Sequence, residues 1–340
     1  MKTIRAIRGR AARSLVDQRG FTLIELMIAL VLGLIVSGAA LALFVTNKRT
    51  YVASENMGRV QENARTAFEL MSRDVREAGG NPCDANVPIG NALNDTSWWS
   101  NWGSGVTGYN GAAAFAGAPF GTSTGARVNG TDAIELRSGV DTGIAVIGAM
   151  PDPSANIDVQ STSGISNNDL VMICDFNQAA IFQVTQTPAG LKIQHNKGAG
   201  NPGNCTKDLE YPIDCSGSAH GQPFTEGAHI AKLRVSGWYV GCNGRTDCAT
   251  PQGRSLYQVS VDTPPTLAKN EITEGVNNMT LKYLVDGGTD YVLAGAVADW
   301  NKVVAVYVDL EMVGQDKVST DNDVLRRHLL HVVTLRNRAQ

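Results

Sequence analysis

The sequence predicts an α+β protein in which one very long N-terminal helix packs on an antiparallel β-sheet domain. Two patterns predict this class. The first 80 residues hold an apolar run followed by an amphipathic helical repeat. From residue 132 onward, β-branched or alternating segments are separated by clusters of Gly, Pro, Asn and Asp. The 36 glycines and the low share of charged residues, 18%, also suit a loop-rich β protein.

The first part of the expected helix, residues 21–45, is apolar except for Glu25. A helix of that length reaches ~37 Å, enough to cross a hydrocarbon core of ~30 Å. The residues before Gly20 carry six basic side chains against the single acid Asp17. The positive-inside rule therefore predicts a cytoplasmic N-terminus. A carboxylate in such a segment costs about 2.5–3.5 kcal/mol on insertion scales, so Glu25 needs a compensating partner.

Two ordinary explanations of this N-terminus fit incompletely. A secretory signal peptide has a shorter apolar region, followed promptly by a small-x-small cleavage signal that is missing here. A permanent signal anchor accounts for the length and the orientation. It gives no reason for Gly20 or Glu25.

Residues 46–80 are expected to continue the helix as an amphipathic segment. Apolar residues recur at three- and four-residue steps on one face: Met57, Val60, Ala64, Phe68, Met71, Val75 and Ala78. Two pairs of opposite charge are spaced four apart on the other face: Glu55 with Arg59, and Glu69 with Arg73. The run Gly79-Gly80-Asn81-Pro82 ends the helix. Residues 21–78 thus predict one nearly continuous helix of ~87 Å.

Residues 81–131 are rich in Gly, Asn, Ser, Thr and Ala and predict a long irregular connection with at most a short strand or helical turn. We expect Trp98, Trp99 and Trp102 to pack this connection onto its own domain rather than to form a contact patch. Residues 103–108 match the Gly-x-Gly-x-x-Gly pattern of nucleotide sites. No strand is expected before them and no helix after them, so we assign no nucleotide site.

Residues 132–340 are expected to form the β-rich domain. Strands are predicted at 132–137, 169–174, 180–185, 191–195, 229–240, 255–261, 279–285, 303–313 and 330–336. Asp175-Phe176-Asn177-Gln178 is typical of the connection in a hairpin.

All six cysteines lie beyond the apolar segment: Cys83, Cys174, Cys205, Cys215, Cys242 and Cys248. With a cytoplasmic N-terminus they are on the oxidising side of the membrane, which favours disulfides. Fifteen pairings are formally possible. Cys205 with Cys215 and Cys242 with Cys248 are close in sequence, which leaves Cys83 with Cys174. Zinc is the competing interpretation, but no Cys-x-x-Cys and no finger spacing to histidine is present.

Composition and motifs argue against nucleic-acid binding and against catalysis. The net charge is -3, and no basic patch interleaved with aromatic residues occurs after residue 20. The five histidines form no His-Glu-x-x-His motif, and there is no Gly-x-Ser-x-Gly and no Walker loop. We therefore expect no enzyme, no cofactor and no metal. Two oxygen-rich runs, residues 286–290 and 321–323, are expected to be turns, with weak calcium binding as the alternative.

The run Gly20-Phe21-Thr22-Leu23-Ile24-Glu25 before an apolar helix resembles the class III leader of type IV pilins and their relatives. The resemblance implies that residues 1–20 are a leader peptide, which a membrane-embedded prepilin peptidase removes by cleaving after Gly20. It implies N-methylation of the new amine of Phe21. It also implies that Glu25 pairs with the N-terminal amine of a neighbouring subunit when the helices bundle in a fibre. The alternative is a lone glutamate tolerated near the membrane surface by snorkelling.

Motifs further along the chain resemble the PilW family of minor pilins. They lie at residues 61–65, 73–80 with Cys83, 275–286, 300–306 and 334–338, whereas residues 84–130 and 196–252 match nothing in that family. The resemblance implies a low-abundance subunit held by a single pass in the inner membrane, with its bulk in the periplasm, until assembly. It implies that the subunit joins other minor pilins and the major pilin at or near the fibre tip. There it would prime polymerisation and help to present a tip adhesin, in a pilus used for cell adhesion or twitching motility.

Two rival functions stay open. Minor pseudopilins of the J type, from type II secretion systems, share this layout, although a processed chain of 320 residues is large for them. A periplasmic enzyme or binding module on a permanent signal anchor is the third hypothesis. It predicts no processing after Gly20 and no effect of Glu25→Ala.

Overall fold

The computed structural model describes residues 20–80, 82–83, 87–94, 97–150, 155–187, 190–216, 221–263, 266–317, 323–336 and 338. Residues 1–19 of the expected leader lie outside the described residues, as do Asp321 and Asn322 of the second oxygen-rich run. The chain divides into two compact units, residues 1–52 and 53–340.

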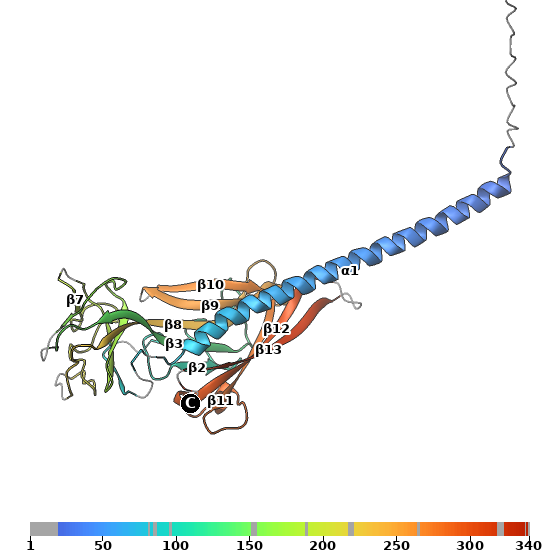
Figure 1. Ribbon diagram of the computed structural model, residues 1–340. Helices are drawn as coiled ribbons and strands as arrows, with labels where there is room; N and C mark the ends of the chain where they lie inside the picture. Colours follow the sequence, from blue (N-terminus) through green and yellow to red (C-terminus); the bar gives the residue numbers. More distant parts are fainter. Residues whose placement is uncertain are drawn as a thin grey trace, which may run out of the picture. The chain divides into compact units, whose positions relative to one another are not determined.

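One long helix precedes all the described strands, which confirms the predicted fold class (Figure 1). The helix is α1 (Leu23–Glu77). The strands are β1 (Ile89–Asn91), β2 (Val106–Tyr109), β3 (Ala133–Ala145), β4 (Asn156–Asp158), β5 (Leu170–Cys174), β6 (Ala179–Gln183), β7 (Lys192–Gln194), β8 (His229–Cys242), β9 (Arg254–Thr263), β10 (Thr266–Glu274), β11 (Val276–Val285), β12 (Val303–Lys317) and β13 (Val324–Thr334). Three short 3-10 helices are η1 (Pro251–Gly253), η2 (Ala294–Ala296) and η3 (Trp300–Lys302).

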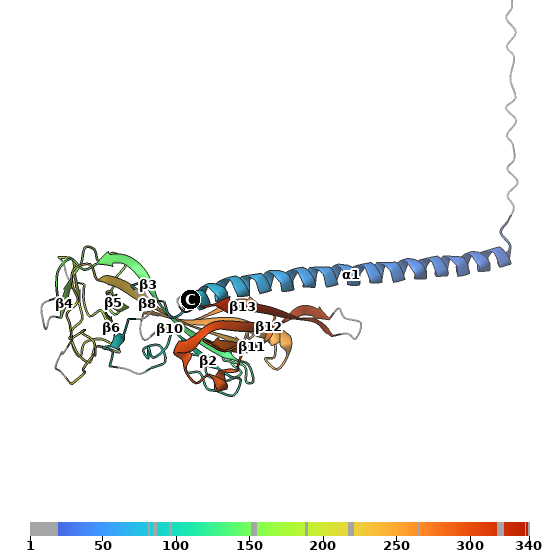
Figure 2. The same ribbon diagram turned by 60° about the horizontal axis from the view of Figure 1, so that its bottom comes forward.

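The described strands form three sheets (Figure 2). The largest runs in the order β1-β6-β5-β8-β3-β2, with β9 on β8 and β10 on β9. Its pairs are antiparallel except β1 with β6. Strand β8 pairs with β3 along one edge, whereas its other edge pairs first with β5 and then with β9. The sheet therefore divides at β8 into two wings. The other sheets are β11-β12-β13 and β4-β7, both antiparallel.

The two wings enclose separate cores. Residues of α1 after position 52 bury Val60, Ala64, Ala67, Met71 and Val75 against β8, β9 and the β11-β12-β13 sheet. Most of these positions belong to the apolar stripe that the sequence predicts. A second cluster fills the β5-β6 wing, including Ile157, Phe182, Ile193, Phe224 and Ile230. The helical spacing of the stripe therefore explains the first core, while residues of strands and of the loops between them build the second.

The predicted charge pairs on α1 are only half right. Arg59 and Glu55 lie 2.6 Å apart, as expected. Glu69, however, pairs with Arg65 at 2.8 Å, and Arg73 pairs with Glu77 at 3.3 Å. A glutamate on a helix has neighbours at both i−4 and i+4, and here the preceding arginine is the partner. The prediction of a Glu69–Arg73 pair is wrong.

The nine predicted strands all overlap observed ones, but β4 and β10 were not predicted, and the connection 81–131 contains two strands, β1 and β2, where one at most was expected. The longest of the unpredicted strands is β10. Its sequence, Thr266–Glu274, is mostly exposed, because β10 pairs only with β9 at the edge of the sheet. An edge strand with little burial has no need for the apolar alternation on which the prediction depended.

The connection between α1 and β3 contains β1 and β2 and is held in place by a buried arginine. The Arg127 guanidinium donates to the carbonyl oxygens of Thr131 (Nε, 3.1 Å), Ala113 (2.9 Å) and Asn110 (2.9 Å). It also lies 4.6 Å from the ring centre of Phe120. Burial lowers the pKa of Arg127 to about 10, so the side chain is still charged at neutral pH. Carbonyls from two turns thus converge on one cation.

The tryptophan-containing part of this connection is tied to β3 by a second buried group. Arg137 donates to the carbonyl oxygens of Ser104 (2.8 Å) and Trp98 (2.9 Å), and it forms an ion pair with Glu135. Trp99 is buried, and Trp98 contacts the ring of Phe115 edge-on. Both side chains pack within unit 53–340, as expected from the sequence.

Candidate functional site

The expected processing position, Gly20, makes no packing contact of its own. A Cβ built on Gly20 would meet no atom within 4 Å. No positive φ is recorded there either. The fold of the described chain therefore does not require glycine at this position, and a requirement for a small residue has to come from another molecule.

The residues after Gly20 start α1 with a reciprocal pair of hydrogen bonds. The Glu25 carboxylate accepts from the backbone N–H of Thr22 and from its hydroxyl, both at 2.9 Å. The Glu25 N–H donates in return to the Thr22 hydroxyl at 3.3 Å. This is a capping box, which satisfies two N–H groups that a helix end otherwise leaves unpaired. This local role differs from the two predicted for Glu25, pairing with a neighbouring subunit and snorkelling near the membrane surface. The Thr-x-x-Glu spacing in the sequence is the signal for this local one.

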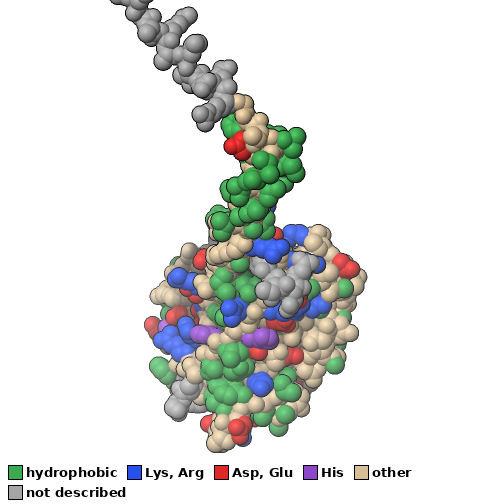
Figure 3. Space-filling model, turned by 90° about the vertical axis from the view of Figure 1, so that its right-hand side faces the viewer, with side chains coloured by type: hydrophobic (Ala, Val, Ile, Leu, Met, Phe, Trp, Pro, Cys, Tyr) green, Lys and Arg blue, Asp and Glu red, His purple; other side chains and the backbone are tan. Residues whose placement is uncertain are grey.

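Residues 20–51, which comprise the first half of α1 and the three residues before it, are all exposed. They include large hydrophobic ones such as Phe21 (89% exposed), Leu23 (77%) and Ile24 (67%). By length and composition α1 can cross a membrane. Figure 3 shows the hydrophobic covering of this half. A continuous apolar surface of this size needs lipid or other helices around it.

The second half of α1 is joined to the largest sheet by a buried carboxylate. Asp74 Oδ2 accepts from the Ser236 hydroxyl (3.0 Å), the Trp238 indole N–H (2.9 Å) and the Gln258 amide (2.6 Å). Its other oxygen lies 3.2 Å from the Arg234 guanidinium. Four donors from β8 and β9 thus share one helix residue, which sets the register of α1 on the sheet.

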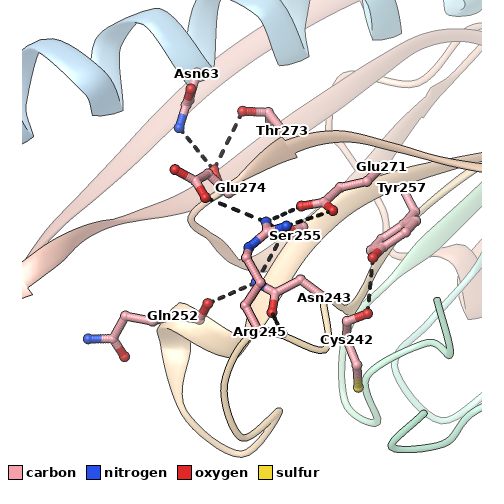
Figure 4. A network of polar contacts seen from close by, with 10 residues as sticks. All are labelled: Asn63, Cys242, Asn243, Arg245, Gln252, Ser255, Tyr257, Glu271, Thr273 and Glu274. Carbon is pink, nitrogen blue, oxygen red and sulfur yellow. Dashed lines mark hydrogen bonds and ion pairs between the residues drawn. The ribbon is translucent and has the colours of Figure 1, made fainter. Parts of the chain in front are cut away.

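A second link joins α1 to a disulfide-closed loop (Figure 4). The Asn63 amide donates to the carbonyl oxygen of Glu274 at 3.2 Å. Glu271, three residues earlier on β10, pairs through both carboxylate oxygens with Arg245, which also lies 3.5 Å from the Glu274 carboxylate. Arg245 sits inside the loop closed by Cys242 and Cys248. Asn63 and Asp74, both in the motifs that resemble PilW proteins, are therefore docking residues for the helix.

All six cysteines form disulfides, in the three pairs suggested by their positions in the sequence. The pairs are Cys83–Cys174, Cys205–Cys215 and Cys242–Cys248. Cys83–Cys174 closes the longest span, 91 residues, and ties the chain after α1 to the end of β5. Closing so long a loop restricts the unfolded chain more than the two local bridges do.

Motif residues that lie far apart in the sequence also meet where α1 ends. The Arg338 guanidinium donates to the carbonyl oxygen of Trp300 at 2.7 Å and lies beside Gly79. Gly79 has a φ of +73° and its N–H donates to the Arg137 carbonyl oxygen at 2.8 Å. A glycine that ends a helix in the left-handed region is the usual C-terminal signal. The last described residue of the chain thus packs on the residue that turns the chain into the sheet.

The other predicted site residues give no metal centre in the described part of the chain. No group of three or more His, Cys, Asp or Glu side chains gathers there as a metal would require. Asp286, from the first oxygen-rich run, lines a cleft of about 940 Å³ together with Trp102, Tyr291, Lys302 and Arg338. The cleft mixes aromatic groups with both signs of charge.

Comparison with known proteins finds one match. Residues 16–41 match the model of the prokaryotic N-terminal methylation motif. The motif supports a pilin or pseudopilin type. It spans the expected cleavage position, Glu25 and most of the exposed apolar helix, and it implies processing by a prepilin peptidase followed by assembly with other pilins. No curated protein and no solved structure matches the chain.

Proposed function

We propose that this chain is a structural, non-enzymatic minor pilin of PilW-like type, incorporated at or near the tip of a type IV pilus. The observation that carries the proposal is the N-terminal segment. It combines the methylation motif with a single acid at the head of an exposed apolar helix. Before assembly this helix holds the chain in the inner membrane, with the N-terminus cytoplasmic and unit 53–340 periplasmic.

Processing is the first step of the proposed function. Prepilin peptidase cleaves after Gly20 and the new amine of Phe21 is methylated. The freedom around Gly20 supports this assignment, because no atom of the described chain lies within 4 Å of a Cβ there. Glycine is therefore kept for recognition by a peptidase rather than for the fold.

Assembly is the second step. The Glu25 carboxylate, turned back toward Thr22 by the capping box, is held at the start of α1, close in sequence to the Phe21 amine. In a bundle of helices it pairs with the amine of a neighbouring subunit, because an uncompensated charge among apolar helices is expensive. The pairing fixes the register between subunits.

The PilW-like assignment rests on where its motifs lie. Asn63, Asp74, Gly79, Trp300 and Arg338 all take part in joining α1 or its end to the sheets. A subunit that transmits fibre contacts from its helix to a large domain needs such a junction. Joining other minor pilins and the major pilin, priming polymerisation and presenting a tip adhesin belong to this proposal.

The nearest rival is a minor pseudopilin of type II secretion, which would use the same processing and the same Glu25 pairing. Surface fibres that contain the chain, and that are lost when its gene is deleted, support the pilus. Loss of protein secretion without loss of fibres supports the rival.

The deciding experiment is intact-mass and N-terminal analysis of the chain purified from its own membranes. We expect a chain that begins at Phe21 and carries an added methyl group on its amine. A chain that begins at Met1, or that is cut beyond Val45, would contradict the proposal and favour an anchored or secreted domain.

A further inference from the structure

The hairpin between β5 and β6 presents an aromatic side chain to solvent. Phe176 is 88% exposed, whereas the next most exposed large hydrophobic residue described in unit 53–340, Leu330, is 58% exposed. Both strands of the hairpin are buried along their whole length. Turn positions usually carry Gly, Asn, Asp or Ser, each for a reason of backbone geometry. A phenylalanine at such a position contributes nothing of that kind.

The turn that carries Phe176 is held rigidly. The Asp175 carboxylate accepts from the N–H groups of Asn177 (2.8 Å) and Gln178 (3.0 Å). Cys174, directly before the turn, is buried and bridged to Cys83. The Gln178 amide, directly after it, donates to the carbonyl oxygen of Gln222 at 2.5 Å and accepts from the N–H of Tyr211 at 2.8 Å. A rigid aromatic side chain loses little conformational freedom when a partner covers it.

The loop that bonds to the turn carries more acids than bases. Tyr211, which bonds to the turn, lies in the loop closed by Cys205 and Cys215. That loop has one lysine against three acids: exposed Lys207 against half-buried Asp208, Glu210 and Asp214. Asp175 adds another acid within the turn itself. An excess of negative charge in the loop bonded to the turn repels anionic lipid headgroups and attracts a basic protein surface.

We propose that the β5–β6 turn is a protein-docking knob, in which Phe176 enters an apolar socket with a basic rim on a neighbouring subunit. This inference rests on the proposed function, because the partner is a protein that assembles with this chain in the same fibre. Exposed aromatic anchors on rigid supports are typical centres of binding energy in interfaces.

The test compares full-length variants expressed in place of the parent in its own cells. We expect Phe176→Ser to be processed normally and to keep the parent's Tm, because the side chain makes no buried contact. We expect it to enter sheared fibres ~10-fold less, in line with the loss of one interface anchor. Phe176→Trp, which keeps a large ring, and the matched surface control Leu330→Ser are expected to enter fibres like the parent.

Each other outcome decides against the proposal. Normal incorporation of Phe176→Ser, while Glu25→Ala is excluded, overturns the docking knob and leaves the proposed function intact. Absence of the parent chain itself from sheared fibres overturns both.

An environment-sensitive amino acid at position 176, placed in the full chain in vesicles of phosphatidylethanolamine and phosphatidylglycerol, reports on the lipid alternative. A blue shift of its emission without any partner protein would assign the turn to the membrane.

Discussion

The two halves of α1 differ in the contacts that their polar side chains make. In residues 23–52 the single acid, Glu25, is satisfied within the first turn, and the surrounding apolar surface is exposed. In residues 53–77 the buried polar residues Asn56 and Asp74 reach strands more than 150 positions away. Polar contacts of that kind specify one arrangement of helix on sheet. Among the described residues, the side chains of residues 23–51 make no such contact to a strand, as is needed if lipid or other helices are to surround this segment in turn.

The largest effect that would distinguish the N-terminal segment from the rest of the chain is expected from substitutions at Gly20. Replacing Gly20 by Val places a branched side chain at the cleavage position, so we expect processing to be abolished. Gly20→Ala is small enough to be processed like the parent. The Tm of the domain should not change in either variant, since no atom lies near a Cβ at this position. An anti-peptide blot or intact mass measures the cleaved fraction, and equal cleavage of the Val variant would count against the peptidase assignment.

The opposite pattern, a loss of stability with normal processing, is expected for a substitution at Asp74. Asp74→Ala leaves the indole N–H of Trp238 and the hydroxyl of Ser236 without their buried acceptor. We expect the free energy of unfolding to fall by about 3 kcal/mol, because removing one partner of a buried charged network costs roughly that much. The Tm should fall by roughly 6–12 °C for a domain of this size.

Processing after Gly20 should be unchanged in Asp74→Ala. The matched control is Glu62→Ala, an exposed acid on the same helix, which should shift stability by no more than about 0.5 kcal/mol. Thermal unfolding of both full-length variants in detergent checks this prediction. A Tm for Asp74→Ala within the range of the control would show that the register of α1 is set by apolar packing alone.

A pair of substitutions at Glu25 sharpens the comparison within the first half. Glutamine can still complete the capping box with Thr22, but it has no charge to pair with an amine. We expect Glu25→Gln and Glu25→Ala to be inserted and processed, and both to enter sheared fibres about tenfold less. Rescue by Gln but not by Ala would mean that Glu25 acts only as a helix cap.

Local patterns in the sequence were enough to predict the helix, its apolar stripe and the disulfide pairs. The stripe is readable because packing repeats every three to four residues. The two short disulfide loops are readable because their ends are close in sequence. Strand β10 was missed because an exposed edge strand lacks alternation. The partner of Glu69 was mistaken because two arginines compete at equal spacing.

The docking contacts could not be predicted in the same way. Asp74 lies on the helix among Arg73, Val75 and Arg76, which suggests an ordinary solvated acid. Its donors are 162 and 164 positions away for Ser236 and Trp238, so only the folded chain reveals them. The buried Arg127 is similar, since its acceptors are backbone carbonyls that no side-chain pattern marks. The capping box, in contrast, was readable from Thr22 and Glu25.

The smallest expected effect is a loss of stability at low pH through Glu271. This residue lies on β10, the strand whose Glu274 carbonyl oxygen accepts from Asn63. Burial opposes ionisation of Glu271, but hydrogen bonds from Arg245 and Ser255 and the charge of Arg245 outweigh it, so its pKa is lowered from the usual 4.5. A carboxyl whose pKa is lower in the folded state stabilises the fold above its unfolded pKa. That contribution is lost as the pH falls through the lowered value. Because Arg245 is half exposed, we expect only about 0.5 kcal/mol.

Arg245→Gln measures this contribution. At neutral pH the variant should be less stable than the parent by about 0.5 kcal/mol, and well below pH 4.5 the difference should vanish, because Glu271 is then protonated in both proteins. Denaturant unfolding at the two pH values gives the comparison. An equal deficit at both would show that Arg245 acts through its neutral contacts, such as the one to Ser255, rather than through its charge. In that case the link from the disulfide loop through β10 to Asn63 would be independent of pH.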